Sequence, residues 1–342
     1  MMRKNACFII AELSANHGGS LETAKETVRA AKRAGADAIK LQTYTADTIT
    51  LNVKTDDFKI KQGTAWDGQF LYDLYQKASL PWEWHKDLFD LAKEEGLVCF
   101  SSPFDKTAVD FLEELNTPIY KVASFEITDI PLIAYMASKQ KPMIISTGIA
   151  TIEDIELAIE ACKSVGNNNI TILKCTSAYP AAPEDANLST IADIEQRFGV
   201  NSGLSDHTMG IEAPMIAVAL GAKVIEKHFI LDKSIGGADA HFSLDETEFK
   251  QMVDAVRLTE QLMGNVDYIM TDKKKKSREF SRSLYVAQDV KAGDELTELN
   301  VRSVRPGFGM HPKYYNEILG KKFKKDLKKG TPLSLELIFQ NS

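Results

Sequence analysis

Short apolar runs bounded by turn residues recur along the first two thirds of the chain. Eight of them follow one another, at residues 7–13, 38–42, 98–102, 120–124, 143–147, 171–176, 203–207 and 224–229. Within each run the apolar residues are largely consecutive instead of alternating with polar ones. This pattern is typical of strands that are buried on both faces of a parallel sheet.

Amphipathic patterns typical of helices lie between or after these runs. They cover residues 21–34, 82–95, 106–115, 132–138, 152–164, 188–198, 212–220 and 248–263. Thr151 and Asp245 stand where helix N-caps are expected, directly before or close to the start of a helical pattern. Eight strand–helix units in succession predict an α/β protein with a (β/α)₈ TIM barrel over residues 1–265.

The regular alternation of strands and helices is interrupted in two places. Residues 43–72 show no clear period, and in a barrel they would form a long loop after the second strand, on the catalytic face. After the barrel, a lysine-rich linker over residues 266–283 leads to residues 284–342, which contain short β-like runs and turn signals. This last segment predicts a small β-rich domain.

Composition and charge narrow the class of protein. The chain has 44% hydrophobic and 26% charged residues, as globular proteins do, and 41 basic against 48 acidic side chains give a net charge of −7. That balance argues against binding to nucleic acid or to an anionic membrane. The lysines at 273–276 could form a nucleic-acid patch, but no aromatic residues alternate with them, which favours a solvated linker.

The cysteines and the apolar segments indicate the compartment. Four cysteines lie far apart, at positions 7, 99, 162 and 175, and three of them are inside apolar runs. This spacing predicts buried, reduced thiols. We find neither a signal-peptide pattern nor a stretch near the roughly 18 apolar residues of a membrane span, so a cytoplasmic protein is expected.

Candidate chemistry lies at the ends of the strands, because the carboxyl ends of the strands form the active face of a parallel barrel. Lys40 and Lys121 stand inside apolar strands, where a lysine is costly to bury without a partner. They therefore favour a site for a phosphate or carboxylate. Serines end several other strands and could join this site, although a turn or helix cap is the better explanation for any single serine.

Two histidines end the seventh and eighth runs, within SGLSDHT and EKHF. A lone strand histidine is more often structural, but His207 and His228 at successive strand ends can converge on a cation. With so few protein ligands, manganese or magnesium fits better than a closed zinc site. Alternation along the strand places Ser205 on the same side as His207 and turns Asp206 away from the metal.

Carboxylates near the same strand ends suggest proton transfer or recognition of hydroxyl groups. Glu12, Glu126 and Asp239 could each orient a sugar hydroxyl or act as a general acid or base. A structural salt bridge is the alternative for each of them.

A series of motifs along nearly the whole chain resembles the sialic acid synthase (NeuB-like) family. In the barrel these are AELSANH, KLQTY, SSPFD, YKVASFE, STGIA, KCTSAYP, GLSDHT and EKHF. SRSLY and SVRPGFG follow, and they resemble a C-terminal antifreeze-like (SAF) domain. Among the subgroups, the chain is most similar to the pseudaminic acid synthases, on AELSANH, KCTSAYP, HFILDKSI and SVRPGFG with the following HPKYY.

The resemblance implies a transferase that condenses phosphoenolpyruvate with an open-chain amino sugar and water, by C–O cleavage, releasing phosphate. For the pseudaminic subgroup the sugar is 2,4-diacetamido-2,4,6-trideoxy-β-L-altropyranose in its open-chain aldehyde form. Synthesis of N-acetylneuraminate or legionaminate by the same apparatus is the alternative. Ser177 replaces the asparagine of CTN, and Gly237-Ala238-Asp239-Ala240 replaces GPDH, and both departures argue against N-acetylneuraminate.

The resemblance also implies a role for each matching residue. His207 and His228 would hold a divalent metal, manganese by preference, with magnesium or cobalt as alternatives. Phosphoenolpyruvate would contact Lys40, Ser102, Lys121, Ser124, Ser146, Ser177 and Ser205. The sugar would contact Glu12, Gln42, Tyr179 and Asp239, together with Phe280 and Arg305. Glu12, Glu126, His207 and His228 would be catalytic, and Glu126 would serve in proton transfer near the leaving phosphate. Arg305 would come from the small domain of a partner chain, because family members are domain-swapped homodimers.

Two other functional classes remain open from the residues alone. A metal-dependent barrel aldolase or isomerase would need no phosphate donor. A sugar-binding protein would rely on its antifreeze-like module and show no turnover.

Overall fold

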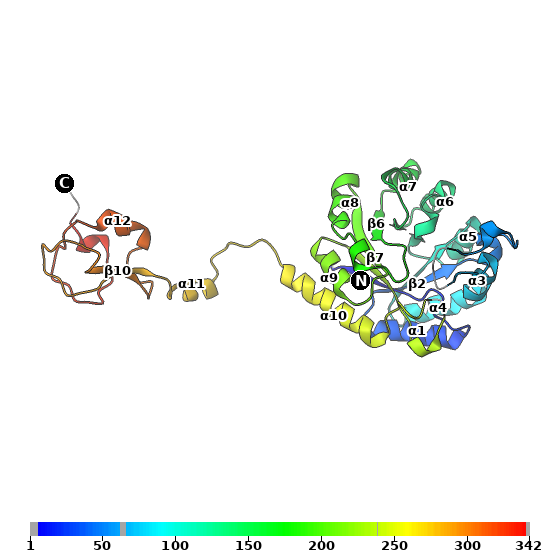
Figure 1. The fold of residues 1–342 in the computed structure, drawn as a ribbon, viewed down its shortest axis with the longest axis horizontal. Coiled ribbons are helices and arrows are strands. Elements are labelled where there is room, and N and C mark those ends of the chain that lie inside the picture. The colour runs from blue at the N-terminus through cyan, green and yellow to red at the C-terminus, as the bar shows by residue number, and fades with distance from the viewer. Residues whose placement is uncertain (1–5, 62–65, 238, 340–342) are drawn as a thin grey trace. The chain divides into compact units, whose positions relative to one another are not determined.

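The structure is a computed structural model that describes residues 6–61, 66–237 and 239–339. It contains two compact units, Met1–Gly264 and Asn265–Ser342. The first unit carries the strands and helices of the barrel, and the second carries the small C-terminal elements (Figure 1).

A closed barrel of parallel strands forms the centre of the first unit. The strands are β1 (Phe8–Glu12), β2 (Ala38–Thr43), β3 (Val98–Pro103), β4 (Tyr120–Val122), β5 (Met143–Ser146), β6 (Ile170–Cys175), β7 (Asn201–Asp206) and β8 (Val224–His228). Each pairs with the next in chain order, and β8 pairs with β1, where Glu12 lies opposite His228. The predicted (β/α)₈ barrel is confirmed, with every predicted strand present in the predicted order.

Helices cover the outside of the barrel (Figure 1). They are α1 (Leu21–Arg33), α4 (Trp82–Glu94), α5 (Lys106–Glu114), α6 (Ile130–Ser138), α7 (Ile152–Ser164), α8 (Thr190–Phe198), α9 (Glu212–Ala219) and α10 (Glu246–Met263). The predicted N-caps are confirmed: Thr151 and Asp245 accept hydrogen bonds from backbone N–H groups in the first turns of α7 and α10. Both caps are capping boxes, which satisfy two unpaired N–H groups at once.

The interior of the barrel changes from apolar to charged along the strands. A lower layer contains Ile10, Ala38, Phe100, Ile119, Ile144, Leu173 and Val224. Because residues two apart share one face of a strand, the next inward positions are Glu12 after Ile10, Lys40 after Ala38 and Glu226 after Val224. The apolar layer thus closes the barrel below and the charged layer forms the floor of a pocket.

The segment after β2 contains short helical pieces that the sequence pattern did not reveal. These are α2 (Ala46–Ile49), the 3-10 turn η1 (Asp56–Phe58) and α3 (Leu71–Ala78). Pieces of three or four residues are too short to show a helical period. As predicted, the segment reaches the carboxyl face of the barrel, since Ile49 and Ile60 line the pocket there.

The second unit is built around a two-stranded antiparallel sheet. Its elements are α11 (Asp272–Arg278), β9 (Ser283–Val286), β10 (Val301–Val304), η5 (Pro312–Tyr314), α12 (Tyr315–Ile318) and η6 (Leu335–Leu337). Buried apolar side chains, among them Leu284, Val301 and Phe323, form its own core. The lysines at 273–276 lie in helix α11 and are solvent-exposed, so part of the predicted linker is helical.

Two further observations concern the whole described chain. Within the described ranges, no helix combines the length and the apolar character needed to cross a bilayer. The four cysteines are all buried and unpaired, as the sequence predicted.

Candidate active site

A pocket of about 510 Å³ lies at the carboxyl ends of the strands. Most residues predicted for the site line it: Glu12, Lys40, Gln42, Lys121, Ser124, Glu126, Ser146, Ser177, Tyr179, Ser205, His207, His228 and Asp239. The strands therefore bring together side chains from all parts of the first unit, as the barrel prediction required.

Three predicted residues are not part of this lining. Ser102 on β3 is 1% exposed, and its hydroxyl has no hydrogen-bond partner in the described part of the chain. Phe104, two residues further on the same face of the chain, lines the pocket instead. Phe280 and Arg305 belong to the second unit, and their roles stay predictions.

The floor of the pocket is a buried cluster of two lysines and two glutamates. Lys40 Nζ lies 3.0 Å from Glu12 Oε1 and 3.0 Å from Glu226 Oε1. Lys121 Nζ lies 3.6 Å from the same Glu226 oxygen and donates a hydrogen bond of 2.9 Å to the Val122 carbonyl. Each positive charge in this cluster is matched by a negative one, which offsets the cost of burying it.

Glu226 was missing from the predicted site. Its Oε1 also accepts a 3.1 Å hydrogen bond from Ser205, while its Oε2 is buried without a partner among the described residues. The signal was present in the sequence, because Glu226 stands two residues before His228 and so shares its face of β8.

The two lysines differ in how firmly they keep their protons. Burial lowers the pKa of both, but Glu12 and Glu226 outweigh burial at Lys40 and raise the pKa of that ammonium overall. At Lys121 burial dominates and its pKa is lowered. Burial raises the pKa of Glu12, yet the ammonium groups of Lys40 and Lys121 hold that pKa below its usual value. Lys40 and Glu12 are therefore a firmly ionised pair.

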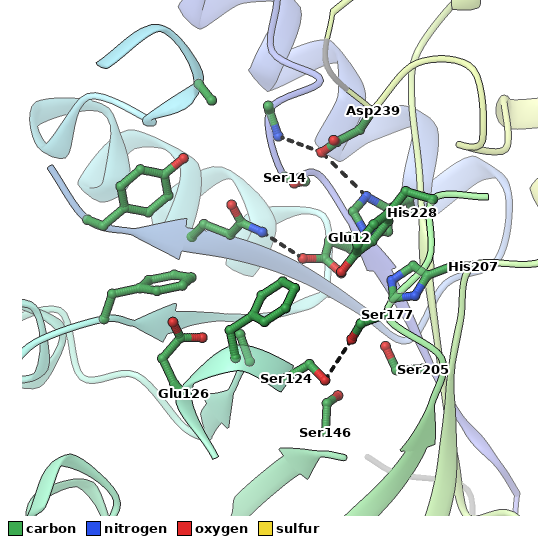
Figure 2. A pocket seen from close by; sticks show the side chains of 18 of the residues that line it. Glu12, Ser14, Ser124, Glu126, Ser146, Ser177, Ser205, His207, His228 and Asp239 are labelled. Carbon is green, nitrogen blue, oxygen red and sulfur yellow. Dashed lines mark hydrogen bonds and ion pairs between the residues drawn. The ribbon is translucent and has the colours of Figure 1, made fainter. Parts of the chain in front are cut away.

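Several serine hydroxyls, among them those of Ser124, Ser146 and Ser177, gather in one part of the pocket (Figure 2). Ser124 Oγ accepts hydrogen bonds from Gly148 N at 2.6 Å and from Ser177 Oγ at 2.9 Å, which leaves its own proton free to donate. A Cβ at Gly148 would lie 2.1 Å from Ser177 Oγ, so only glycine permits this approach. Ser146 Oγ is buried and finds no partner within the described ranges. These donors, beside two ammonium groups, form a site for an oxyanion.

His207 and His228 lie next to each other at one side of the pocket, with ring centroids 5.2 Å apart (Figure 2). His207 Nδ1 is 2.9 Å from the Thr176 carbonyl, so Nδ1 carries a proton and Nε2 is the nitrogen left for a ligand. His228 lies between two carboxylates, with Nε2 3.4 Å from Glu12 Oε2 and Nδ1 3.6 Å from Asp239 Oδ2.

The protonation of the two histidines follows from their neighbours. Burial lowers the pKa of His228, and the attraction of Glu12 and Asp239 does not reverse this. At His207 burial also lowers the pKa, but Cys175, whose sulfur lies 3.8 Å from Nδ1, raises it overall. His228 is therefore a neutral imidazole near neutral pH, the form that binds metals.

The donor atoms around these histidines fit a loosely held divalent cation. Among the described residues no group of three or more histidine, cysteine or acidic side chains is arranged as a metal-binding set. The two imidazoles, with Glu12 and Asp239 beside them, supply few ligands and leave open positions. Such a set suits manganese or magnesium, which accept water and substrate oxygens, better than a closed zinc site.

The carboxylates differ in their surroundings. Gln42 Nε2 donates a 3.0 Å hydrogen bond to Glu12 Oε1, which orients that carboxylate toward the histidines. Glu126 lies across the pocket from His207 and His228 (Figure 2), and its Oε2 is buried without a hydrogen-bond partner in the described chain. Burial raises the pKa of Glu126 to about 7. Glu126 can therefore donate a proton near neutral pH.

One wall of the pocket is apolar. It is formed by the segment after β2 and by the end of β3, with Tyr44, Ile49, Ile60, Leu71, Leu74, Tyr75 and Phe104 as lining residues. The Tyr44 ring packs edge to face against Phe104 at 5.1 Å and against Tyr75 at 5.8 Å. We call this surface the apolar wall. The sequence did not predict it, because its residues come from a segment without a period.

Comparisons with known proteins agree with this geometry. Residues 27–268 match the model of the NeuB family, and residues 281–338 match the SAF domain. A pseudaminic acid synthase of Campylobacter jejuni subsp. jejuni serotype O:2 is 53% identical over 326 residues, 95% of this chain and 95% of that protein. A pseudaminic acid synthase of Helicobacter pylori is 51% identical over 329 residues, 96% of each chain. An N,N'-diacetyllegionaminic acid synthase of Legionella pneumophila subsp. pneumophila is 37% identical over 337 residues, 97% of this chain and 94% of that protein.

Proposed function

This chain belongs to the NeuB family, and we propose that it is a pseudaminic acid synthase. The reaction is the condensation of phosphoenolpyruvate with 2,4-diacetamido-2,4,6-trideoxy-β-L-altropyranose, as its open-chain aldehyde, and water. The products are pseudaminic acid and phosphate. The identities of 53% and 51% to pseudaminic acid synthases, against 37% to the legionaminic enzyme, support this choice of sugar.

The observation that carries the proposal is the placement of two different sites in one pocket. An oxyanion site of two buried lysines and several hydroxyls adjoins a pair of histidines suited to a divalent metal. A condensation between an anionic donor and an aldehyde needs both, since the donor must be held while the aldehyde is activated.

The oxyanion site would hold phosphoenolpyruvate. Lys40 and Lys121 offset the charges of its carboxylate and phosphate, and Ser124 and Ser146 have hydroxyl protons free to bind its oxygens. Fixing the donor in this way places its carbon 3 for attack on the aldehyde carbon of the sugar. Water then captures the cation at carbon 2, and the resulting tetrahedral intermediate loses phosphate by C–O cleavage.

Proton transfer falls to the carboxyl groups. Glu126, which is partly protonated at neutral pH, can deliver a proton to the departing phosphate. Glu12 stays ionised beside Lys40 and can orient a sugar hydroxyl or accept a proton. His207 and His228 would hold the metal, which when bound supplies Lewis-acid polarisation of the aldehyde oxygen.

The rest of the pocket suits a deoxygenated diacetamido sugar. Gln42, Tyr179 and Asp239 present polar groups beside the histidines, where the hydroxyl-bearing carbons of the aldehyde would lie. The apolar wall can receive the 6-methyl group and acetamido methyls. A sugar with a hydroxyl at carbon 6 would leave that hydroxyl without a partner there, at a cost of about 1–3 kcal/mol. This argues against N-acetylmannosamine as substrate.

The proposal extends to metal, assembly and location. We propose manganese as the metal, with magnesium or cobalt able to replace it, and a domain-swapped homodimer in the cytoplasm. In that dimer Phe280 and Arg305, from the second unit of a partner subunit, would complete the sugar site. The match to the SAF domain and the family resemblance of the SRSLY and SVRPGFG segments support this assembly.

A substrate panel tests the function directly. The full-length protein with manganese and phosphoenolpyruvate is offered the altro-configured sugar, its manno-configured counterpart and N-acetylmannosamine, and released phosphate and product mass are measured. We expect clear preference for the altro sugar. Preference for the manno-configured diacetamido sugar would make the enzyme a legionaminate synthase, and preference for N-acetylmannosamine would make it a neuraminate synthase. Product formed without phosphoenolpyruvate would instead indicate an aldolase.

A further inference from the structure

A buried ion pair lies directly behind the two histidines. Asp206 and Lys227 are register partners on the adjacent strands β7 and β8. Each immediately precedes one of the histidines, so its side chain points to the opposite face of the strand, away from the pocket. The two side chains form an ion pair there, and the residues are only 3% and 1% exposed.

The ion pair is part of a small closed network that includes Thr208. Asp206 Oδ1 accepts hydrogen bonds from Thr208 N at 2.9 Å and from Thr208 Oγ1 at 2.8 Å. Asp206 Oδ2 pairs with Lys227 Nζ, which also donates a 2.6 Å hydrogen bond to the Thr208 carbonyl. The network thus holds the residues on both sides of His207 and fastens them to the strand that carries His228. We call these three residues the β7–β8 clamp.

Charges at this place in the fold need an explanation other than stability. Fully buried outward positions on other strands carry uncharged side chains, either apolar, such as Leu41 and Val122, or hydroxyl-bearing, such as Ser101. Replacing a buried ion pair by apolar residues of similar volume is often neutral or stabilising. Unlike apolar contacts, the hydrogen bonds and the ion pair of this network are directional. Each of them fixes one backbone position relative to another.

We propose that Asp206 and Lys227 are positioning residues that set the separation of the His207 and His228 imidazoles for the metal. This inference rests on the metal site of the proposed function. With only two protein imidazoles as ligands, metal affinity depends on how well both rings are placed before the metal arrives. The clamp connects the backbones of the two ligands by the shortest available route, across one pair of strands.

The test compares metal affinity with stability in the same variants. Lys227→Met leaves Asp206 buried without its partner and could prevent folding, so the informative variant is the double replacement Asp206→Asn with Lys227→Met. The double variant has no charge at these two positions and keeps side chains of similar size. Binding of Mn²⁺ to the metal-free, full-length protein is followed by the electron paramagnetic resonance signal of free Mn²⁺, and thermal unfolding is recorded in parallel.

We expect the double variant to melt close to the wild type while binding Mn²⁺ roughly 10- to 100-fold more weakly, as replacement of groups that orient metal ligands typically does. Wild-type affinity in a folded double variant would overturn the proposal. Thr208→Val removes one hydroxyl contact to Asp206 and leaves the ion pair in place. It should therefore weaken binding less than the double replacement, and an equal or larger loss would contradict the proposal.

A control variant separates positioning from general loosening of the barrel. Arg257 on α10 pairs with Asp37 at 2.7 Å, near the amino-terminal ends of β1 and β2 and so far from the pocket along the strands. Arg257→Met should lower the melting temperature without changing Mn²⁺ affinity. Equal weakening of Mn²⁺ binding by this variant would overturn the proposal, because the effect would then be a general one.

The measurement also distinguishes failure of this inference from failure of the proposed function. It uses no sugar and no phosphoenolpyruvate, so an unexpected result in the substrate panel would change the proposed reaction and leave the clamp untouched. If His207→Ala bound Mn²⁺ as tightly as the wild type, the metal would not lie at these histidines and the clamp proposal would fail with it.

Discussion

The carboxyl group of Glu126 should make the stability of the barrel depend on pH in an unusual direction. Burial raises its pKa from an ordinary value of 4.5 to about 7. The folded state therefore keeps a proton that the unfolded chain has already released, and stability falls as pH rises from about 4.5 to about 7. At about 1.4 kcal/mol for each pKa unit, ionising Glu126 costs the folded state about 3 kcal/mol at and above pH 8.

Replacement of Glu126 by glutamine should abolish this dependence, because glutamine has a similar shape and no charge to lose. The difference in unfolding free energy between Glu126→Gln and the wild type should grow by about 3 kcal/mol in favour of the variant between pH 4.5 and pH 8. Any constant packing difference between the two side chains cancels in this comparison.

Urea unfolding followed by tryptophan fluorescence measures this difference. The three tryptophans, Trp66, Trp82 and Trp84, all belong to the first unit, so the signal reports on the barrel. The exposed Glu114 on α5 provides a matched control, and Glu114→Gln should follow the wild type at every pH. If the plots of unfolding free energy against pH were parallel for the wild type and Glu126→Gln, the reasoning would be refuted. Glu126 would then ionise alike in the folded and unfolded states.

The same replacement should lower catalysis while it raises stability. If Glu126 delivers a proton to the departing phosphate, wild-type turnover should decline above pH 7 as the carboxyl ionises. Glu126→Gln should remove this decline and reduce kcat by about 10²- to 10⁴-fold, the usual contribution of general acid catalysis. A variant with full kcat would assign the proton transfer to another group.

Three further predictions concern other parts of the pocket. His207→Ala should abolish both Mn²⁺ binding and turnover while leaving the melting temperature nearly unchanged, and metal-dependent activity at the wild-type level in that variant would refute the ligand assignment. Lys121→Met should raise KM for phosphoenolpyruvate by about 10- to 100-fold with little effect on KM for the sugar, measured by phosphate release, because one charge-assisted contact is lost. Leu74→Asn in the apolar wall should reduce the preference for the 6-deoxy sugar over its 6-hydroxyl counterpart by about tenfold in kcat/KM, and an unchanged ratio would place the methyl group elsewhere.

The barrel was predictable because its strands are buried on both faces. Unbroken apolar runs such as 143–147 leave few alternatives to a buried strand, and the length of the intervening helices leaves few alternatives to parallel pairing. Lys40 and Lys121 were predictable as residues of the pocket for an energetic reason, because a lysine inside an apolar strand must find a partner. The structure supplies those partners as Glu12 and Glu226.

The contacts that the sequence did not reveal depend on register or on irregular backbone. Lys227 and Asp206 pair because β7 and β8 align them, and the register of two strands is not readable from either strand alone. The apolar wall depends on short turns after β2 that have no period. Ser102 lies outside the pocket lining, which Phe104 joins two residues later, and the substrate contact of Ser102 stays a prediction.

The seam between β1 and β8, where Glu12 lies opposite His228, determines when the pocket can form during synthesis of the chain. A nascent polypeptide that ends before β8 contains Lys40 and Lys121 but lacks Glu226 and the second histidine. Its barrel has two open edges and its lysines lack half of their counter-charges. The last strand therefore closes the sheet, balances the buried charges and completes the proposed metal site in one step. A divalent cation should then favour the closed barrel over open intermediates, because only the closed form can bind it tightly.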